Sequence, residues 1–456
     1  MDMSTHHHAD VDEKPTKGLP TLASSKIWMI NFGFLGVQTA FTLQSSQMSR
    51  IFQTLGADPN NLGWFFILPP LAGLIVQPLV GKYSDKTWLP KLGGRRLPYL
   101  LLGAIVAVIV MMLLPNSGSF GFGYGSLAAL WFGAITVALL DLSSNVAMQP
   151  FKMMVGDMVN DDQKSYAYGI QSFLSNTGAV LAAIFPFLLT LFGVSNTAAK
   201  GVVPNSVVWA FYIGAALLVL TSALTITKVK EYDPDTYALY HGIAVEDNEE
   251  SESFVKLLKK APKAFWTVSL VQLFCWFGFQ YLWTYSTGTI AENVWHTTDA
   301  TSAGYQAAGN WYGILAAVQS IAAVVWSYVL AKIPNQYHKA GYAGSLFLGA
   351  IGFASIFMIH SKTALIFSFI LVGIAWAAMN TYPLTIVTNA LSGKRMGTYL
   401  GLFNGCICLP QIIASVLSFS LYPALGGVQG HMFIVAALAI LLGALSVGFI
   451  KETYQE

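Results

Sequence analysis

The chain has 456 residues, of which 55% are hydrophobic and only 10% are charged, and its formal net charge at pH 7 is +2. A water-soluble domain carries about 25% charged residues, so the composition excludes a soluble globular protein and places most of the chain in a lipid bilayer. The near-neutral charge gives no indication of a nucleic-acid partner.

Twelve apolar stretches are each long enough to cross a bilayer, which takes about 20 residues in a helix. They form two sets of six around a polar segment, so we predict an all-α membrane protein with 12 transmembrane helices in two six-helix bundles. The stretches begin near Ile27, Leu62, Leu97, Leu127, Tyr166, Ser206, Lys263, Gly304, Ala340, Thr363, Thr398 and His431. The predicted parts are a tail at 1–26, a bundle at 27–227, a linker at 228–262, a bundle at 263–450 and a tail at 451–456.

Lysine and arginine are distributed unevenly over the two sides of these predicted helices. If the amino terminus is inside, 21 of the 24 basic residues lie in inner segments, and the exceptions are Arg50, Lys200 and Lys362. Because basic residues gather on the cytoplasmic side, we expect both termini and the linker to lie in the cytoplasm. We also expect the protein to be a monomer in the cell (inner) membrane. Arg50 is expected to snorkel to the outer interface; a longer first helix would instead place it in an outer vestibule.

A glycine- and charge-rich loop joins the second and third predicted helices, at residues 81–86 and 93–98. Glycine in this loop lets two helix ends approach closely. The aspartate of the loop can cap the next helix or pair with a base, and the two arginines of the loop remain at the inner surface. The loop resembles the signature loop of the major facilitator superfamily, whose carriers have six plus six helices and use this loop as a conformational latch. The resemblance implies gating roles for Gly81, Asp85, Arg95 and Arg96.

The fourth predicted helix contains the only carboxylate deep inside a predicted span, Asp141. A carboxylate in the bilayer costs about 2.5–3.5 kcal/mol on insertion scales, so it indicates an ion or proton pathway, with a structural anchor between helices as the alternative. Asp141 is followed by Asn145, Pro150, Lys152 and Asp157. This order is similar to that of plant sucrose–proton symporters and their bacterial maltose and sucrose relatives, with Lys152 in place of arginine. The resemblance implies proton coupling by Asp141 and gating by Lys152 and Asp157.

Amide and aromatic side chains are unusually frequent in several predicted spans. Aromatic faces can contact the C–H surfaces of a sugar while amides reach its hydroxyl groups. Interfacial aromatic belts and amides that pin helices together remain the alternative for each residue alone. The predicted sugar contacts are Gln38, Gln44, Asn145, Gln272, Trp276, Trp283, Asn310, Gln319 and Asn380.

These features together predict proton-coupled uptake of a neutral disaccharide by alternating access of two bundles around a central site. The resemblance points to an α-glucoside such as maltose or sucrose. A proton-coupled exporter of a small apolar metabolite or drug, and a sodium-coupled glycoside carrier, are the alternatives. No catalytic triad, phosphate loop or metal-ligand cluster is visible, and the histidines at 6–8 lack further ligands, so we expect neither an enzyme nor a metal or other cofactor.

Overall fold

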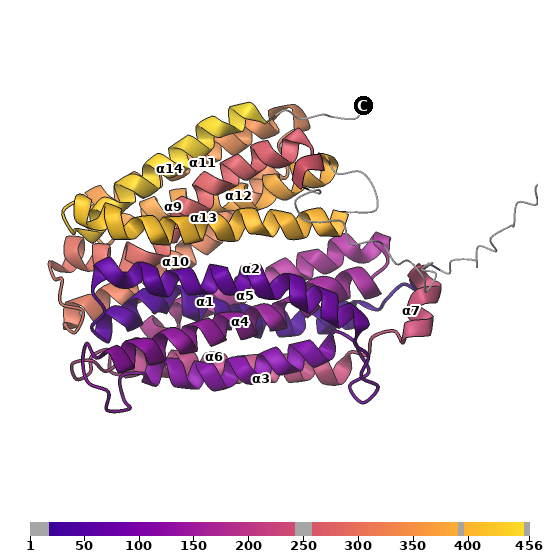
Figure 1. Ribbon diagram of the computed structural model, residues 1–456, viewed down its shortest axis with the longest axis horizontal. Helices are drawn as coiled ribbons and strands as arrows, with labels where there is room; N and C mark the ends of the chain where they lie inside the picture. The colour runs from indigo at the N-terminus through magenta and orange to yellow at the C-terminus, as the bar shows by residue number, and fades with distance from the viewer. Residues whose placement is uncertain (1–17, 242–257, 391–395, 451–456) are drawn as a thin grey trace, which may run out of the picture.

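A computed structural model describes residues 18–241, 258–390 and 396–450, and it is helical with short connections throughout those ranges (Figure 1). Within them, side chains are described except at 77–78, 81–82, 85–86, 161, 165, 241, 335, 384–385, 388–390 and 396–401. The first six long helices are α1 (Ser24–Thr54), α2 (Leu62–Lys86), α3 (Leu97–Leu113), α4 (Leu127–Met158), α5 (Asp161–Leu191) and α6 (Asn205–Lys228). The second six are α9 (Lys263–Trp295), α10 (Ala303–Leu330), α11 (His338–Met358), α12 (Leu365–Ala390), α13 (Met396–Ala424) and α14 (Met432–Ser446).

The predicted fold of twelve helices in two bundles is confirmed, and most helices begin within three residues of the predicted start. The largest difference is α5, which begins five residues before the predicted Tyr166 because polar residues form its first turn. The Asn160 side chain accepts a hydrogen bond from the backbone N–H of Gln163 at 3.0 Å, which caps this turn. A short helix, α7 (Pro234–His241), follows α6 in the linker.

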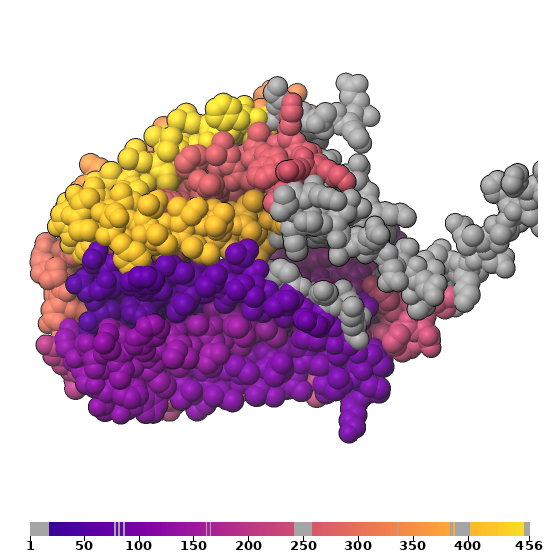
Figure 2. Space-filling view, in the orientation of Figure 1, coloured from indigo at the N-terminus to yellow at the C-terminus, as the bar shows by residue number. Residues whose placement is uncertain are grey.

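The two bundles lie against each other along α2 and α13 and along α5 and α10. Figures 1 and 2 show α2 (indigo) and α13 (orange) running side by side at this boundary. Small residues permit the contact: a Cβ at Gly63 would overlap the carbonyl oxygen of Ser415, and one at Gly313 would overlap that of Ala183. The two halves therefore meet as closely packed surfaces.

Two long helices differ from the other ten, which are apolar enough to cross a membrane by length and composition alone. These two, α1 and α9, carry many amide and hydroxyl side chains, and most of those side chains are buried. Each opens its bundle, and the two contact each other as well as their own neighbours. Their polar residues are therefore shielded from lipid by protein, which is the condition under which the bilayer tolerates them.

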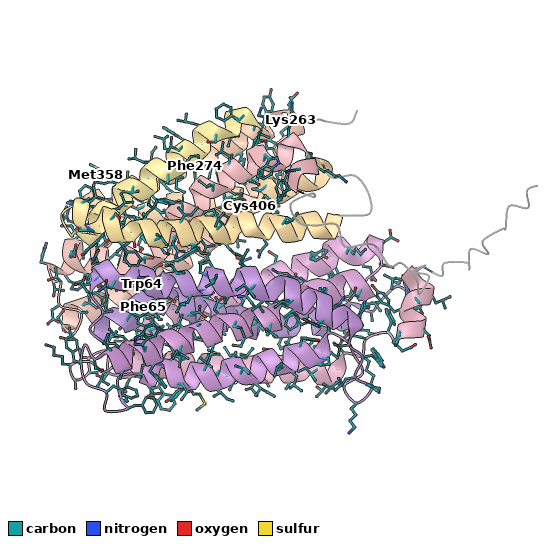
Figure 3. All side chains as sticks on the ribbon, viewed as in Figure 1. Trp64, Phe65, Lys263, Phe274, Met358 and Cys406 are labelled. Atoms are coloured by element: carbon teal, nitrogen blue, oxygen red, sulfur yellow. The ribbon has the colours of Figure 1, made fainter. Side chains whose placement is uncertain are left out.

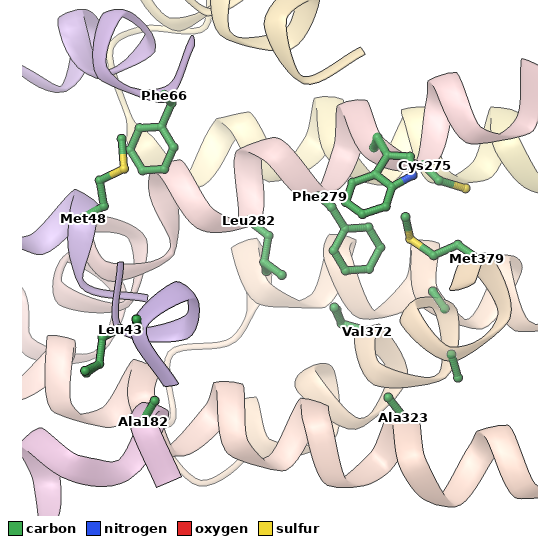
Figure 4. Packing of buried hydrophobic residues seen from close by; sticks show 14 of the residues in the cluster. Leu43, Met48, Phe66, Ala182, Cys275, Phe279, Leu282, Ala323, Val372 and Met379 are labelled. Carbon is green, nitrogen blue, oxygen red and sulfur yellow. The ribbon is translucent and has the colours of Figure 1, made fainter. Parts of the chain in front are cut away.

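The two ends of the molecule are distinguished by what lies there. Figure 3 shows Lys263, at the start of α9, toward the same end as α7, whereas Met358, at the end of α11, lies at the other. We call the first the linker end and the second the distal end. Between them, packed apolar side chains fill each bundle; in Figure 4, for example, Phe279 of α9 lies beside Met379 of α12.

Candidate functional site

A cavity of about 470 Å³ lies between the bundles, and its walls come from both halves of the chain. The lining residues belong to α1, α2, α4 and α5 on one side and to α9, α10, α12 and α13 on the other. We call these sides the N-terminal wall and the C-terminal wall. A cavity at the interface of two similar bundles is the usual position of a substrate site in a secondary transporter.

The N-terminal wall contains a buried carboxylate that is held by two amides. Asp141 is 2% exposed. Its Oδ1 accepts a hydrogen bond from Gln44 Nε2 at 3.1 Å, and its Oδ2 accepts one from Asn145 Nδ2 at 2.8 Å. Asn145 Nδ2 also donates to the backbone carbonyl of Asp141 at 2.9 Å, since the two residues are one helical turn apart. Both carboxylate oxygens therefore have neutral donors from α1 and α4.

The C-terminal wall contains three tryptophans in mutual contact. The ring centroids of Trp276 and Trp283 are 6.2 Å apart, and Trp376 lies 5.6 Å from the first and 6.0 Å from the second. Phe279 packs behind them, with its ring centroid 5.1 Å from that of Trp376. Edge-to-face and tilted contacts of this kind fix ring orientations, so the cavity has a preformed aromatic surface.

Seven of the nine predicted sugar contacts, and the predicted proton-coupling residue, line this cavity. The residues that line it are Gln38, Gln44, Asp141, Asn145, Trp276, Trp283, Gln319 and Asn380. Gln272 is instead buried inside the C-terminal bundle, where its Nε2 donates to the carbonyl oxygen of Met379 at 2.8 Å. Asn310 lies toward the distal end, bonded to Arg50 and Thr190, so the structure places neither of these two in the cavity wall.

Several lining residues were not among the predicted sugar contacts. Trp376 lies one turn before Asn380 on α12, and that four-residue spacing was the signal available in the sequence. Asn404 and Gln411 are seven residues apart on α13 and line the cavity together. Asn176 of α5 had no comparable pattern around it, because its neighbours along the helix are hydroxyl and apolar residues.

Arg50 seals the distal end of the cavity and does not snorkel to an interface. Its side chain is 1% exposed because α1 continues to Thr54 and α10 covers it. The guanidinium donates to Gln306 Oε1 at 2.7 Å and to Asn310 Oδ1 at 2.9 Å. It also donates to Oδ1 of Asn196, which lies in the loop after α5, at 2.8 Å. The expected interfacial position of Arg50 was therefore wrong, since Gln306, Asn310 and Asn196 reach it from segments more than 140 residues away in sequence.

Further hydrogen bonds join the bundles at the same end. Ser49 Oγ donates to the carbonyl oxygen of Thr284 at 2.6 Å. The amides of Gln53 and Gln429 bond to each other in both directions, at 3.3 and 3.0 Å. These contacts close the distal end with neutral side chains around the guanidinium of Arg50.

Toward the linker end, the cavity walls are accessible. Asn380 on α12 is exposed although it lies in the middle of the molecule. Lys152 on α4 is also exposed, and it lies eleven residues after Asp141, on the same helical face. The structure is therefore closed at the distal end and open toward the linker end.

The predicted gating residues gather at the linker end of the N-terminal bundle. Both Arg95 and Arg96 contact Asp157 Oδ2 at 3.0 Å, and Arg96 also bonds to Ser84 of α2. The guanidinium of Arg95 stacks 3.6 Å above the ring of Tyr237, whose hydroxyl donates to Asp157 at 3.2 Å. This cluster connects α2, α3, α4 and α7. The predicted Gly81 and Asp85 belong to α2, but the surroundings of Gly81 and the side chain of Asp85 lie outside what the structure describes.

The acid at the start of α3 is Glu231, which was not among the predicted site residues. Its carboxylate accepts hydrogen bonds from the backbone N–H groups of Arg96 and Leu97, both at 2.9 Å. Burial raises the pKa of the Glu231 carboxyl, although these backbone donors and Arg96 favour its charged form. Because helix N-termini attract negative charge, Glu231, which follows the end of α6 in the chain, acts as the cap of α3.

Comparison with known proteins identifies the family. The sequence model of the Major Facilitator Superfamily matches residues 30–415. The chain belongs to this superfamily. Relatives include the sucrose transport proteins SUC4 of Arabidopsis thaliana, 23% identical over 90% of this chain and 86% of that protein, and SUT5 of Oryza sativa subsp. indica, 24% identical over 92% and 86%. The protein is thus a multi-pass membrane protein of a transporter family and not an enzyme.

Solved structures agree with this fold. The nucleoside transporter NupG (D323A mutant) has a TM-score of 0.65 at 15% identity, covering 93% of this chain and all of that one. A bacterial homolog of the human lysosomal transporter Spinster, in an inward-facing and unoccupied conformation, has a TM-score of 0.63 at 15% identity, covering 94% of each chain. At this identity the likeness establishes the shared architecture alone.

Proposed function

We propose that this protein takes up a neutral disaccharide, an α-glucoside such as maltose or sucrose, together with a proton. The observation that carries the proposal is a central cavity in which Asp141 and amides form one wall and three tryptophans form the other. Sugar hydroxyls are neutral donors and acceptors that amides can satisfy, and aromatic faces can cover the C–H surface of a sugar ring. The names of the plant relatives, sucrose transport proteins, support the same class of substrate.

The orientation follows from charge. Basic residues gather in the segments at the linker end, so we place both termini and the linker in the cytoplasm. The membrane that the protein spans is then the inner membrane of the cell. The described conformation then opens inward, with its outer side closed by the contacts around Arg50. Alternating access would break these contacts and bring the linker ends of the two bundles together.

Asp141 supplies the coupling in this scheme. A proton from the outer side neutralises the carboxylate, which removes a charge from the protein interior before the bundles reorient. The sugar binds beside it and travels in the same step. On the inner side the proton leaves to water that enters through the open linker end, and the empty carrier returns.

The test is the pH outside de-energised, lightly buffered cells when maltose, sucrose or trehalose is added. Wild-type protein should remove protons from the medium with its substrate, and Asp141→Asn should not. Asp162→Asn is the matched control, because Asp162 is an exposed carboxylate away from the cavity, and it should behave as wild type. No alkalinisation with any sugar, in protein that elutes as a folded species, would contradict symport; proton-driven efflux of an apolar compound would favour an exporter.

A further inference from the structure

The amide of Gln44 is placed to follow the protonation of Asp141. In the described state Gln44 Nε2 donates to Asp141 Oδ1 at 3.1 Å, while Gln44 Oε1 is buried with no hydrogen-bond partner. We propose that Gln44 turns its amide over when Asp141 takes up a proton, and that this turn passes the proton state to the sugar site. The proposal deepens the proposed function and rests on it for the sugar.

The argument begins with hydrogen-bond inventory. An ionised carboxylate only accepts hydrogen bonds, whereas a protonated one also carries an O–H donor. If the proton binds on the Oδ1 side, two donors face each other across 3.1 Å. Rotation of the amide by half a turn about its last torsion replaces Nε2 with Oε1. The O–H of Asp141 then donates to Oε1, and the oxygen that had no partner gains one.

Asn145 cannot make the same exchange without a loss. Its Nδ2 donates both to Asp141 Oδ2 at 2.8 Å and to the Asp141 backbone carbonyl at 2.9 Å. The backbone carbonyl remains an acceptor in either protonation state, so it holds the Asn145 amide in its present orientation. The response is therefore asymmetric: the amide from α1 turns, and the amide from α4 stays.

No charged neighbour competes for this role among the described side chains around Asp141. Cys408 of α13 is the titratable group that faces it from the other bundle. In α2 and α3, no ionisable residue occurs between Leu62 and Val76 or between Leu100 and Leu113. Of the two cations of α1, Arg50 lies six residues beyond Gln44 and Lys26 lies eighteen residues before it, and the cation of α4, Lys152, lies eleven residues beyond Asp141. The nearest responding groups are therefore the two amides.

The consequence for the sugar is a change of partner. Gln44 is among the residues that line the cavity, and after the turn its NH₂ group occupies the position that its buried carbonyl oxygen has in the described state. A hydroxyl group placed there would accept from Gln44 in the protonated state and would have to donate to it in the deprotonated state. A bound sugar that is fixed by the tryptophans can satisfy one arrangement better than the other. Gln44 is thus a positioning residue that couples the two ligands.

Gln44→Met tests this, because methionine keeps the length of the side chain and has no amide. The first measurement is the difference infrared spectrum of the purified protein in lipid between acid and alkaline pH. The band of the protonated Asp141 carboxyl is identified by its loss in Asp141→Asn. In Gln44→Met this band should move to higher frequency, because the O–H has lost its acceptor. Gln44→Leu should do the same, and Gln38→Met, from the same helix and cavity, should leave the band in place.

The second measurement is sugar affinity at acid and alkaline pH. We expect wild type to bind about ten-fold more tightly at acid pH, and Gln44→Met to show a difference of about two-fold or less. Gln38→Met should bind more weakly at both values and keep the wild-type ratio.

An unmoved infrared band in both Gln44 variants, or an equal shift in Gln38→Met, would overturn the role of Gln44. A wild-type pH ratio in Gln44→Met would do so too. If the band moves as expected but wild type binds no sugar, the amide turn stands and the proposed substrate fails, so the two failures are distinguishable.

Discussion

The two walls of the cavity are built from different chemistry. The N-terminal wall has a carboxylate with amide donors on both of its oxygens, and the C-terminal wall has three tryptophans backed by a phenylalanine. The first wall can change its charge and its hydrogen bonds when a proton arrives. The second cannot, because indole rings do not titrate and their mutual packing fixes them. Under the proposed function, the first wall responds to the proton and also contributes amides to the sugar site, and the second wall supplies the aromatic surface of that site.

The largest expected effect comes from removing the charge of the N-terminal wall. One proton moving through 100 mV is worth about 2.3 kcal/mol, which supports about fifty-fold accumulation of a neutral solute. Asp141→Asn should abolish accumulation in energised vesicles and retain exchange of labelled for unlabelled sugar. Loss of exchange as well, in folded protein, would show that sugar binding itself requires the Asp141 carboxylate, so that the proton response and sugar binding could not be separated within this wall.

The next effect concerns the distal seal, where the two walls are joined. Arg50→Met leaves the amide oxygens of Gln306 and Asn310 without their donor, whereas Asn196 Oδ1 still accepts from the Ser206 hydroxyl. Hydrogen bonds to a charged group contribute about 1.5–3 kcal/mol each. The distal end should open about ten-fold more often or more. Labelling of Ser46→Cys, a buried residue of the cavity wall, by an impermeant maleimide added at the distal side measures this, with the native cysteines replaced by serine. Arg50→Lys keeps the charge and should lie between the two; unchanged labelling in Arg50→Met would remove Arg50 from the seal.

A smaller effect is expected from the C-terminal wall. Trp376→Ala removes the ring that contacts both other tryptophans, and aromatic contacts of this kind contribute about 0.5–1.5 kcal/mol each. Sugar affinity should fall about ten-fold while its dependence on pH stays as in wild type. Trp266→Ala, in an exposed part of α9 outside the cavity, is the control and should change neither. A flattened pH dependence in Trp376→Ala would contradict the separation of the walls.

The smallest effect is that of a single amide in the same wall. Asn380 lines the cavity, and the loss of one hydrogen bond is worth about 0.5–1.5 kcal/mol. Asn380→Ala should weaken sugar binding about five-fold, equally at acid and alkaline pH, as measured by calorimetry. The buried amide Gln272, outside the cavity, serves as the comparison: Gln272→Ala should lower thermal stability without selectively weakening the sugar.

The fold could be predicted from the sequence because apolar length determines which segments cross a bilayer. The start of α5 was missed because Asp161 and its polar neighbours do not count as apolar, and only the capping bond of Asn160 shows that the helix has begun. The bundle boundaries at 227 and 263 remain predictions about folding units.

The cavity could be predicted in part, since Asp141 and Asn145 share a helical face and Trp276 and Trp283 share another. The sequence of one helix does not predict which residues of other helices its side chains will contact. Arg50 was expected at an interface because its partners, Gln306, Asn310 and Asn196, are brought to it only by the packing of α1 against α10 and the loop after α5. Gln272 was expected in the cavity because an amide in a span looks the same whether it faces a ligand or a backbone carbonyl.

The cap on α3 has a consequence for how the protein is made. The ribosome synthesises α3 long before Glu231 and Tyr237, so the rim of the first bundle at the linker end is completed only by residues that are made after α6. During that interval the start of α3 has backbone N–H groups without their final acceptor. A separately expressed first half should therefore extend through His241 and not stop at residue 227, because the shorter fragment lacks the side chains that finish its own rim.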